Sequence, residues 1–174
     1  MISTIGVIGN GQYGRFVTEL TKQHFPDLKV KVFSRRAEID NEEFFDLKTA
    51  SSCDVVVLCC GVCDYEKQME EVTAHISPDT IIVDVSIVKN HANELRARHL
   101  DGVHFISLHT LFGPQSYKKY NNDSDKLKVV VTDYALKNND YQLLKDIFNN
   151  KLLACQDTRG WMCRGRSIMS SPVG

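Results

Sequence analysis

The chain has 174 residues, 43% of them hydrophobic, with 21 Lys and Arg against 22 Asp and Glu and a net charge of −1. This length and composition predict one globular domain with a sizeable core, and the balanced charge argues against a nucleic-acid partner. The longest apolar run, residues 55–60, is too short to cross a membrane, and the N-terminus lacks the pattern of a signal peptide. We therefore expect a cytoplasmic protein, or a plastid protein only if a transit segment has been removed.

Short apolar runs alternate with stretches of helical periodicity along the chain. In chain order they predict a strand at 5–8, a helix at 11–25, strands at 30–33 and 54–60, a helix at 65–76, a strand at 80–85, a helix at 89–99, strands at 103–108 and 127–131, and a helix at 141–148. The unbroken apolar run at 54–60 is typical of a parallel strand covered on both faces. This order predicts an α/β fold with a doubly wound, mostly parallel sheet.

Two stretches depart from this alternation. Residues 113–125 are polar and rich in turn formers, which predicts either a functional flap or a mobile loop. Residues 156–174 lose all apolar periodicity and carry three arginines among Gly, Ser and Pro. We therefore expect a domain at 1–155 and an irregular basic tail at 156–174.

Four of the six cysteines, Cys53, Cys59, Cys60 and Cys63, crowd around one predicted strand. Neighbours on a strand cannot join distant segments, so we interpret them as reduced, buried thiols. Cys60 and Cys63 form a CxxC, but there is no second pair with zinc spacing, and a redox CxxC would be expected to open a helix. We predict no metal site, with a metal or redox role as the alternative.

A G-x-G-x-x-G follows the first predicted strand and opens the first predicted helix, the context in which this motif binds a dinucleotide. The first glycine makes the tight turn, the second lets the backbone approach the pyrophosphate, and the third lets the helix pack on the strand. The alternative is an ordinary glycine turn. The predicted cofactor-binding residues here are Gly9, Asn10, Gly11, Gln12, Tyr13 and Gly14.

Twenty residues beyond the motif, where NAD enzymes place an acidic residue, the chain has Ser34, Arg35 and Arg36. A hydroxyl and two guanidiniums can donate charge-assisted hydrogen bonds to a ribose 2′-phosphate. These residues therefore favour NADP over NAD, the alternative being that the two arginines are a solvated surface pair.

Polar residues also end the later predicted strands: Asp84, Ser86 and Lys89 after one, and His109 after the next. Because carboxyl ends of parallel strands meet at one edge of a sheet, we expect them to face the nicotinamide. His109 ends an otherwise apolar strand and leads into the irregular stretch, a position suited to a site.

Five motifs in this order resemble the prephenate and arogenate dehydrogenases of tyrosine biosynthesis, over residues 4–155. They are GNGQYG at 9–14, FSRR at 33–36, DVVVLCC at 54–60, IIVDVSIVK at 81–89 and HTLFGP at 109–114. The resemblance is closer to the NADP-using arogenate dehydrogenases. It implies a Rossmann-type fold and NADP as cofactor, with Cys60 and Gly61 also next to the cofactor.

The resemblance implies an oxidative decarboxylation of arogenate or prephenate. In this picture His109 accepts the hydrogen bond of the substrate hydroxyl, while Ser86 orients His109 or shares that contact. Lys89 is expected either to cap its helix or to contact the substrate, and neither role is favoured over the other.

The chain also departs from the family pattern. The family's C-terminal helical domain, which closes the substrate pocket and builds the dimer, is expected to be absent, so a homodimer or a partner domain would complete the pocket. Thr110 and Gly61 stand where prolines are usual, which is expected to loosen both segments. The alternatives are an inactive NADP(H)-binding or regulatory module, or another NADP-dependent reductase such as an imine reductase.

Overall fold

The computed structural model describes residues 2–123, 126–127 and 129–135. Its centre is a six-stranded sheet in the order β2-β1-β3-β4-β5-β6, in which β6 alone runs antiparallel to its neighbour. The strands are β1 (Thr4–Ile8), β2 (Lys29–Phe33), β3 (Val55–Leu58), β4 (Ile81–Asp84), β5 (His104–Thr110) and β6 (Val129–Ala135). The helices are α1 (Gln12–His24), α2 (Leu47–Ser51), η1 (Val62–Asp64, a 3₁₀ turn), α3 (Tyr65–Thr73), α4 (Lys89–His99) and α5 (Pro114–Lys119).

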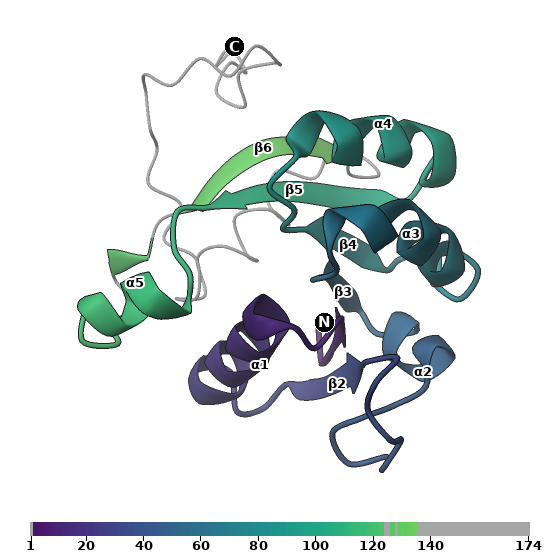
Figure 1. Cartoon of the computed structure of the whole chain (residues 1–174). Helices are drawn as coiled ribbons and strands as arrows, with labels where there is room; N and C mark the ends of the chain where they lie inside the picture. The colour runs from purple at the N-terminus through teal and green to yellow at the C-terminus, as the bar shows by residue number, and fades with distance from the viewer. Residues whose placement is uncertain (1, 124–125, 128, 136–174) are drawn as a thin grey trace, which may run out of the picture.

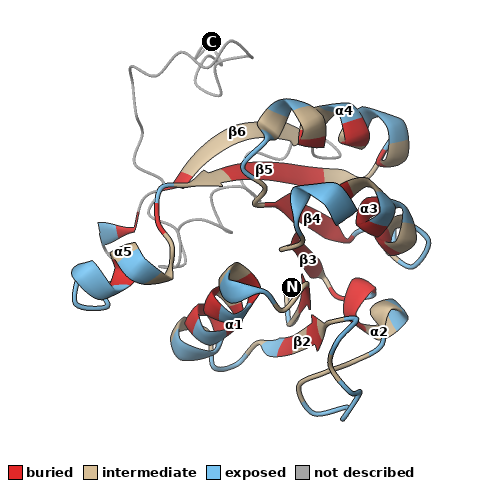
Figure 2. Cartoon of the chain, in the orientation of Figure 1, coloured by how far each residue is buried: buried red, intermediate tan, exposed pale blue. Residues whose placement is uncertain are grey.

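Helices cover both faces of the sheet, as Figure 1 shows. On one face, Phe16 and Leu20 of α1 and Tyr117 of α5 pack on the strands. On the other, side chains of α2, α3 and α4 such as Met69 and Leu95 form a second core. Every residue of β3 and β4 is buried, so these strands are red along their whole length in Figure 2. The doubly wound α/β sheet predicted from the sequence is therefore confirmed.

The chain reverses its direction of travel through the sheet at β1. From β1 it moves outward to β2, and then returns to place β3 on the other side of β1. In open parallel sheets the crevice at such a switch point, outside the carboxyl ends of the strands, is where ligands bind. This edge carries the segments that follow β1, β3, β4 and β5.

Several predicted elements need correction. The described part of the stretch at 113–125 is not all irregular: it contains helix α5, whose Tyr117 is buried and packs on Phe16 of α1. Helix α2 was not predicted. The predicted helix at 141–148 and the tail at 156–174 lie outside the described residues. Among the helices that are described, none is both long and apolar enough for a membrane span.

Candidate functional site

The glycine motif forms the turn between β1 and α1, and its backbone is shaped by close contacts. Gly9 has φ +110°, and a Cβ there would lie 2.7 Å from the carbonyl oxygen of Cys59. A Cβ on Gly14 would lie 1.9 Å from the carbonyl oxygen of Gly9. Gly11 is the N-cap of α1 with no side-chain cap, and a Cβ there would meet nothing within 4 Å. The first turn of α1 is thus free of side-chain caps and suited to an anionic group.

Because of this packing, Gly14→Ala is expected to lower the free energy of unfolding by about 1–3 kcal/mol, the usual cost of overpacking. The turn must also shift, which weakens nucleotide binding. Urea unfolding and a cofactor titration measure the two effects. Gly61→Ala is the matched control for unfolding, since its φ is −70° and its Cβ would meet nothing within 4 Å. Equal unfolding midpoints for the two variants would contradict this account.

The three residues expected at the ribose lie just past β2. Arg35 Nη2 donates to Glu71 Oε2 of α3 at 2.8 Å, and Arg35 Nη1 lies 4.0 Å from Asp64 Oδ1. Arg36 is exposed and makes no ion pair within the described residues, while its N–H donates to Ser34 Oγ at 3.3 Å. Of the two guanidiniums, that of Arg36 is therefore the one without a carboxylate partner in this part of the chain.

The glycine motif and the end of β5 are joined directly by one hydrogen bond. Tyr13 Oη donates to Thr110 Oγ1 at 2.9 Å. Burial raises the pKa of Tyr13 to about 12, so the phenol keeps its proton. Thr110 was expected to loosen the strand end, yet it supplies the acceptor that ties the strand end to α1. His109, the neighbour of Thr110 in β5, is partly buried, and because successive side chains of a strand point to opposite faces, its role at the cofactor stays a prediction.

Asp84 is buried within the protein and is not open to the nicotinamide that it was expected to face. It is fully buried and accepts hydrogen bonds from Tyr65 Oη (2.6 Å), Ser107 Oγ (2.7 Å), Lys89 Nζ (2.7 Å) and the N–H of Ser86 (2.8 Å). Burial alone would raise its pKa, but the charge of Lys89 and these hydrogen bonds outweigh burial and hold the pKa below its usual range. Lys89 therefore anchors the start of α4.

Tyr65 and Ser107 were not predicted as part of this network. The available signals were weak: a tyrosine at the first position of α3, and one serine between Ile106 and Leu108 in the apolar middle of β5. Ser86 contributes its backbone N–H to Asp84, and no hydrogen bond joins it to His109 in the described part of the chain. The orienting role expected for Ser86 stays a prediction.

The four cysteines that the structure describes are free thiols, as expected, but they are not all buried. Cys53 is buried, whereas Cys63 is exposed. Cys60 and Cys63 flank the start of η1, which leads into α3, so this CxxC does open a helix. Burial raises the pKa of Cys60 to about 11 and so favours the unreactive thiol form.

A shallow cleft of about 400 Å³ lies between α1 and α5. Of the predicted site residues only Gln12 lines it; Arg15, Pro114 and Lys118 are among the others. Neither His109 nor Ser86 reaches it, so this cleft is not the predicted catalytic pocket.

Residues 27–151 match a family model described as prephenate dehydrogenase, nucleotide-binding domain. The matched residues begin after the glycine motif at 9–14. The motif is therefore separate evidence for a nucleotide-binding domain, independent of the family match. A search of curated protein sequences finds no match. Among solved structures, 191 chains are similar to this one.

Three of these structures show the range of the likeness. Arogenate dehydrogenase from Synechocystis has a TM-score of 0.65 at 18% identity, over 88% of this chain and 58% of that one. Prephenate dehydrogenase from Aquifex aeolicus has a TM-score of 0.63 at 16% identity, over 90% and 61%. Pyrroline-5-carboxylate reductase from Coxiella burnetii has a TM-score of 0.65 at 12% identity, over 87% and 56%. At these identities the likeness shows the fold, and this chain spans little more than half the length of each.

Proposed function

This chain belongs to the prephenate dehydrogenase family, through the nucleotide-binding domain that residues 27–151 match, and from this premise we propose that it holds NADP(H) for the oxidative decarboxylation of arogenate or prephenate. The observation that supports the proposal is the Tyr13–Thr110 hydrogen bond of 2.9 Å, which joins the glycine motif to the end of β5, the strand that also carries His109. Since the chain spans 58% of the Synechocystis enzyme, a second domain, a second copy or a partner would complete the substrate pocket.

The residues present fit the cofactor. The turn at 9–14 offers backbone N–H groups at the start of α1 to a pyrophosphate. Ser34 and Arg36 can donate to a 2′-phosphate, and Cys60 and Gly61 follow the strand next to β1. When bound, NADP⁺ supplies the hydride acceptor.

His109 is the residue we assign to proton transfer. It accepts the proton of the substrate hydroxyl as hydride leaves the carbon that bears this hydroxyl. The ring carboxylate departs as CO₂, and the electron pair of the broken bond enters the ring, which becomes aromatic. The protein's main contribution is to align substrate and cofactor.

Cofactor preference tests the proposal at Arg36. Arg36→Ala is expected to weaken NADP⁺ binding about tenfold or more, because a hydrogen bond to a charged group contributes about 1.5–3 kcal/mol, with NAD⁺ binding little changed. Arg98→Ala, an exposed arginine of α4, is the matched control. Dissociation constants from titration calorimetry give the comparison, and equal affinity of the unmodified chain for NADP⁺ and NAD⁺ would refute the preference.

A second candidate function is imine reduction, which the likeness to pyrroline carboxylate reductases and to an imine reductase favours. Purified chain with NADP⁺ and arogenate or prephenate should form NADPH, followed by its absorbance, if the family activity holds. Consumption of NADPH with a cyclic imine would instead select the reductase. Cofactor binding without turnover of either substrate would identify a binding or regulatory module.

A further inference from the structure

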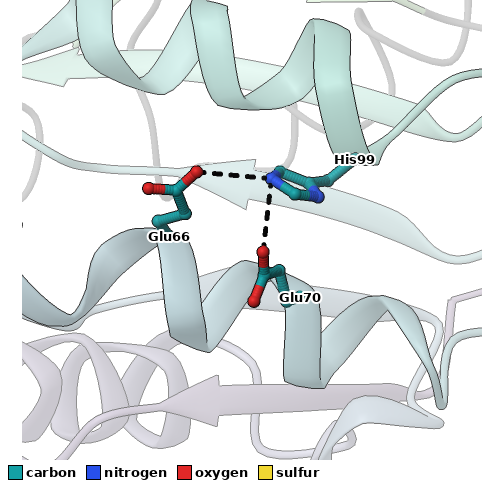
Figure 3. A group of neighbouring side chains, drawn as sticks. All are labelled: Glu66, Glu70 and His99. Carbon is teal, nitrogen blue, oxygen red and sulfur yellow. Dashed lines mark ion pairs between the residues drawn. The ribbon is translucent and has the colours of Figure 1, made fainter.

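Three side chains from two helices converge in a cluster that the proposed function does not use. Glu66 and Glu70 stand one turn apart on α3, and His99 is the last residue of α4. Figure 3 shows both carboxylates turned toward the imidazole. His99 Nε2 lies 3.7 Å from Glu66 Oε1 and 3.7 Å from Glu70 Oε1, and the three ligand atoms all lie within 4.8 Å of one another.

These distances leave the imidazole nitrogen without a hydrogen bond. A separation of 3.7 Å is too long for one. The Nε2 atom is nevertheless buried and has no hydrogen-bond partner among the residues that the structure describes. A buried polar atom without a partner is costly, and here two carboxylate oxygens lie 3.7 Å from it.

We propose that Glu66, Glu70 and His99 form a binding site for a divalent transition-metal ion, with Zn²⁺ the best match. One imidazole nitrogen and two carboxylate oxygens are typical zinc ligands, at about 2.0–2.2 Å from the ion. Tetrahedral geometry then separates the ligand atoms by about 3.4 Å. The two 3.7 Å distances from the imidazole reach this value with a shift of a few tenths of an ångström, and the two carboxylate oxygens, which lie within 4.8 Å of each other, must also draw together. Glu66 and Glu70 are accessible enough for water to take the fourth position.

The electrostatics identify one competitor for the ion. Two carboxylates and the carboxyl end of α4 favour a cation at this place. Arg98 Nη1 already lies 2.8 Å from Glu66 Oε1 and must give up this contact or share the carboxylate when the ion binds. Removal of the Arg98 charge should therefore strengthen metal binding, which would not follow if the three residues were merely ion-paired.

A bound ion would clamp α3 to α4. Helix α3 also carries Tyr65, which contacts Asp84, and Glu71, which holds Arg35. Metal binding would thus make α3 more rigid, and α3 is the helix that contacts both Asp84 and Arg35. Metal binding at this site does not depend on which substrate, if any, the chain converts.

The test uses the full 174-residue chain, reduced, with Co²⁺ as a spectroscopic probe and Zn²⁺ as its competitor. We expect one Co²⁺ to bind with visible absorption of nitrogen and oxygen ligation, without the intense near-ultraviolet band of thiolate ligation, and to be displaced by Zn²⁺. His99→Ala and Glu70→Gln should each weaken binding at least about tenfold, and Arg98→Ala should strengthen it. His75→Ala, an exposed histidine after α3, is the matched control and should bind as the unmodified chain does.

Thermal unfolding in EDTA establishes that each variant is folded before metal is added. Unmodified chain should gain several degrees in Tm with saturating Zn²⁺, and His99→Ala should not. Equal affinity of His99→Ala and the unmodified chain, a thiolate band that places the ion on cysteines, or no binding would each overturn the proposal.

Discussion

Asp84→Ala is expected to lower the free energy of unfolding by about 3–5 kcal/mol, the usual cost of breaking a buried ion pair by removing one partner. The carboxylate is fully buried, and its removal leaves Lys89 with an uncompensated charge. Tyr65 and Ser107 lose their acceptor at the same time. Urea unfolding measures the loss.

The same network predicts how stability depends on pH. The pKa of Asp84 is lower in the folded protein than its usual value, so its contribution is present at neutral pH and is lost as pH falls through the lowered folded-state pKa. Asp84→Asn should lose this part of the acid dependence. Asp101→Ala, an exposed aspartate in the turn before β5, is the control and should unfold within about 0.5 kcal/mol of the unmodified chain. A comparable loss for Asp101→Ala would contradict the assignment.

His109→Asn is expected to lower turnover by about 100-fold or more, the usual contribution of a positioned acid or base. Asparagine can keep a hydrogen bond to the substrate hydroxyl but cannot take its proton. Initial rates of NADPH formation with arogenate or prephenate measure the effect, and cofactor affinity should be retained.

His75→Asn is the matched control for this change, since His75 is exposed and lies between α3 and β4. It should turn over at the rate of the unmodified chain. Full turnover by His109→Asn would remove His109 from the mechanism, while a parallel loss of NADP⁺ affinity would indicate a positional rather than a chemical role.

The elements that could be predicted from sequence are those whose pattern is local. The apolar runs of β3 and β4 are buried on both faces, and the glycine spacing at 9–14 matches a turn in which Gly9 has a positive φ and Gly14 has no room for a side chain. Helix α4 spans Lys89–His99, the same residues as the helix predicted from the sequence. In each case the neighbours in sequence determine the conformation.

The features that escaped prediction depend on partners distant in sequence. Helix α5 is almost entirely polar, and the contact of its Tyr117 with Phe16 of α1 is what distinguishes it from a loop. Asp84 looked like a site residue because nothing local shows that Tyr65 and Ser107, 19 and 23 residues away, satisfy it. The pairing of Arg35 with Glu71 likewise arises only when the fold brings α3 next to the segment that follows β2.

The hydrogen bond between Tyr13 and Thr110 has a consequence for sequence design. A proline at position 110 would remove the hydroxyl that accepts from the tyrosine and leave a partly buried phenol without this acceptor. Positions 13 and 110 must therefore be changed together: proline at 110 calls for phenylalanine at 13. In a library that varies both positions, folded members should show this covariation although 97 residues separate the two along the chain.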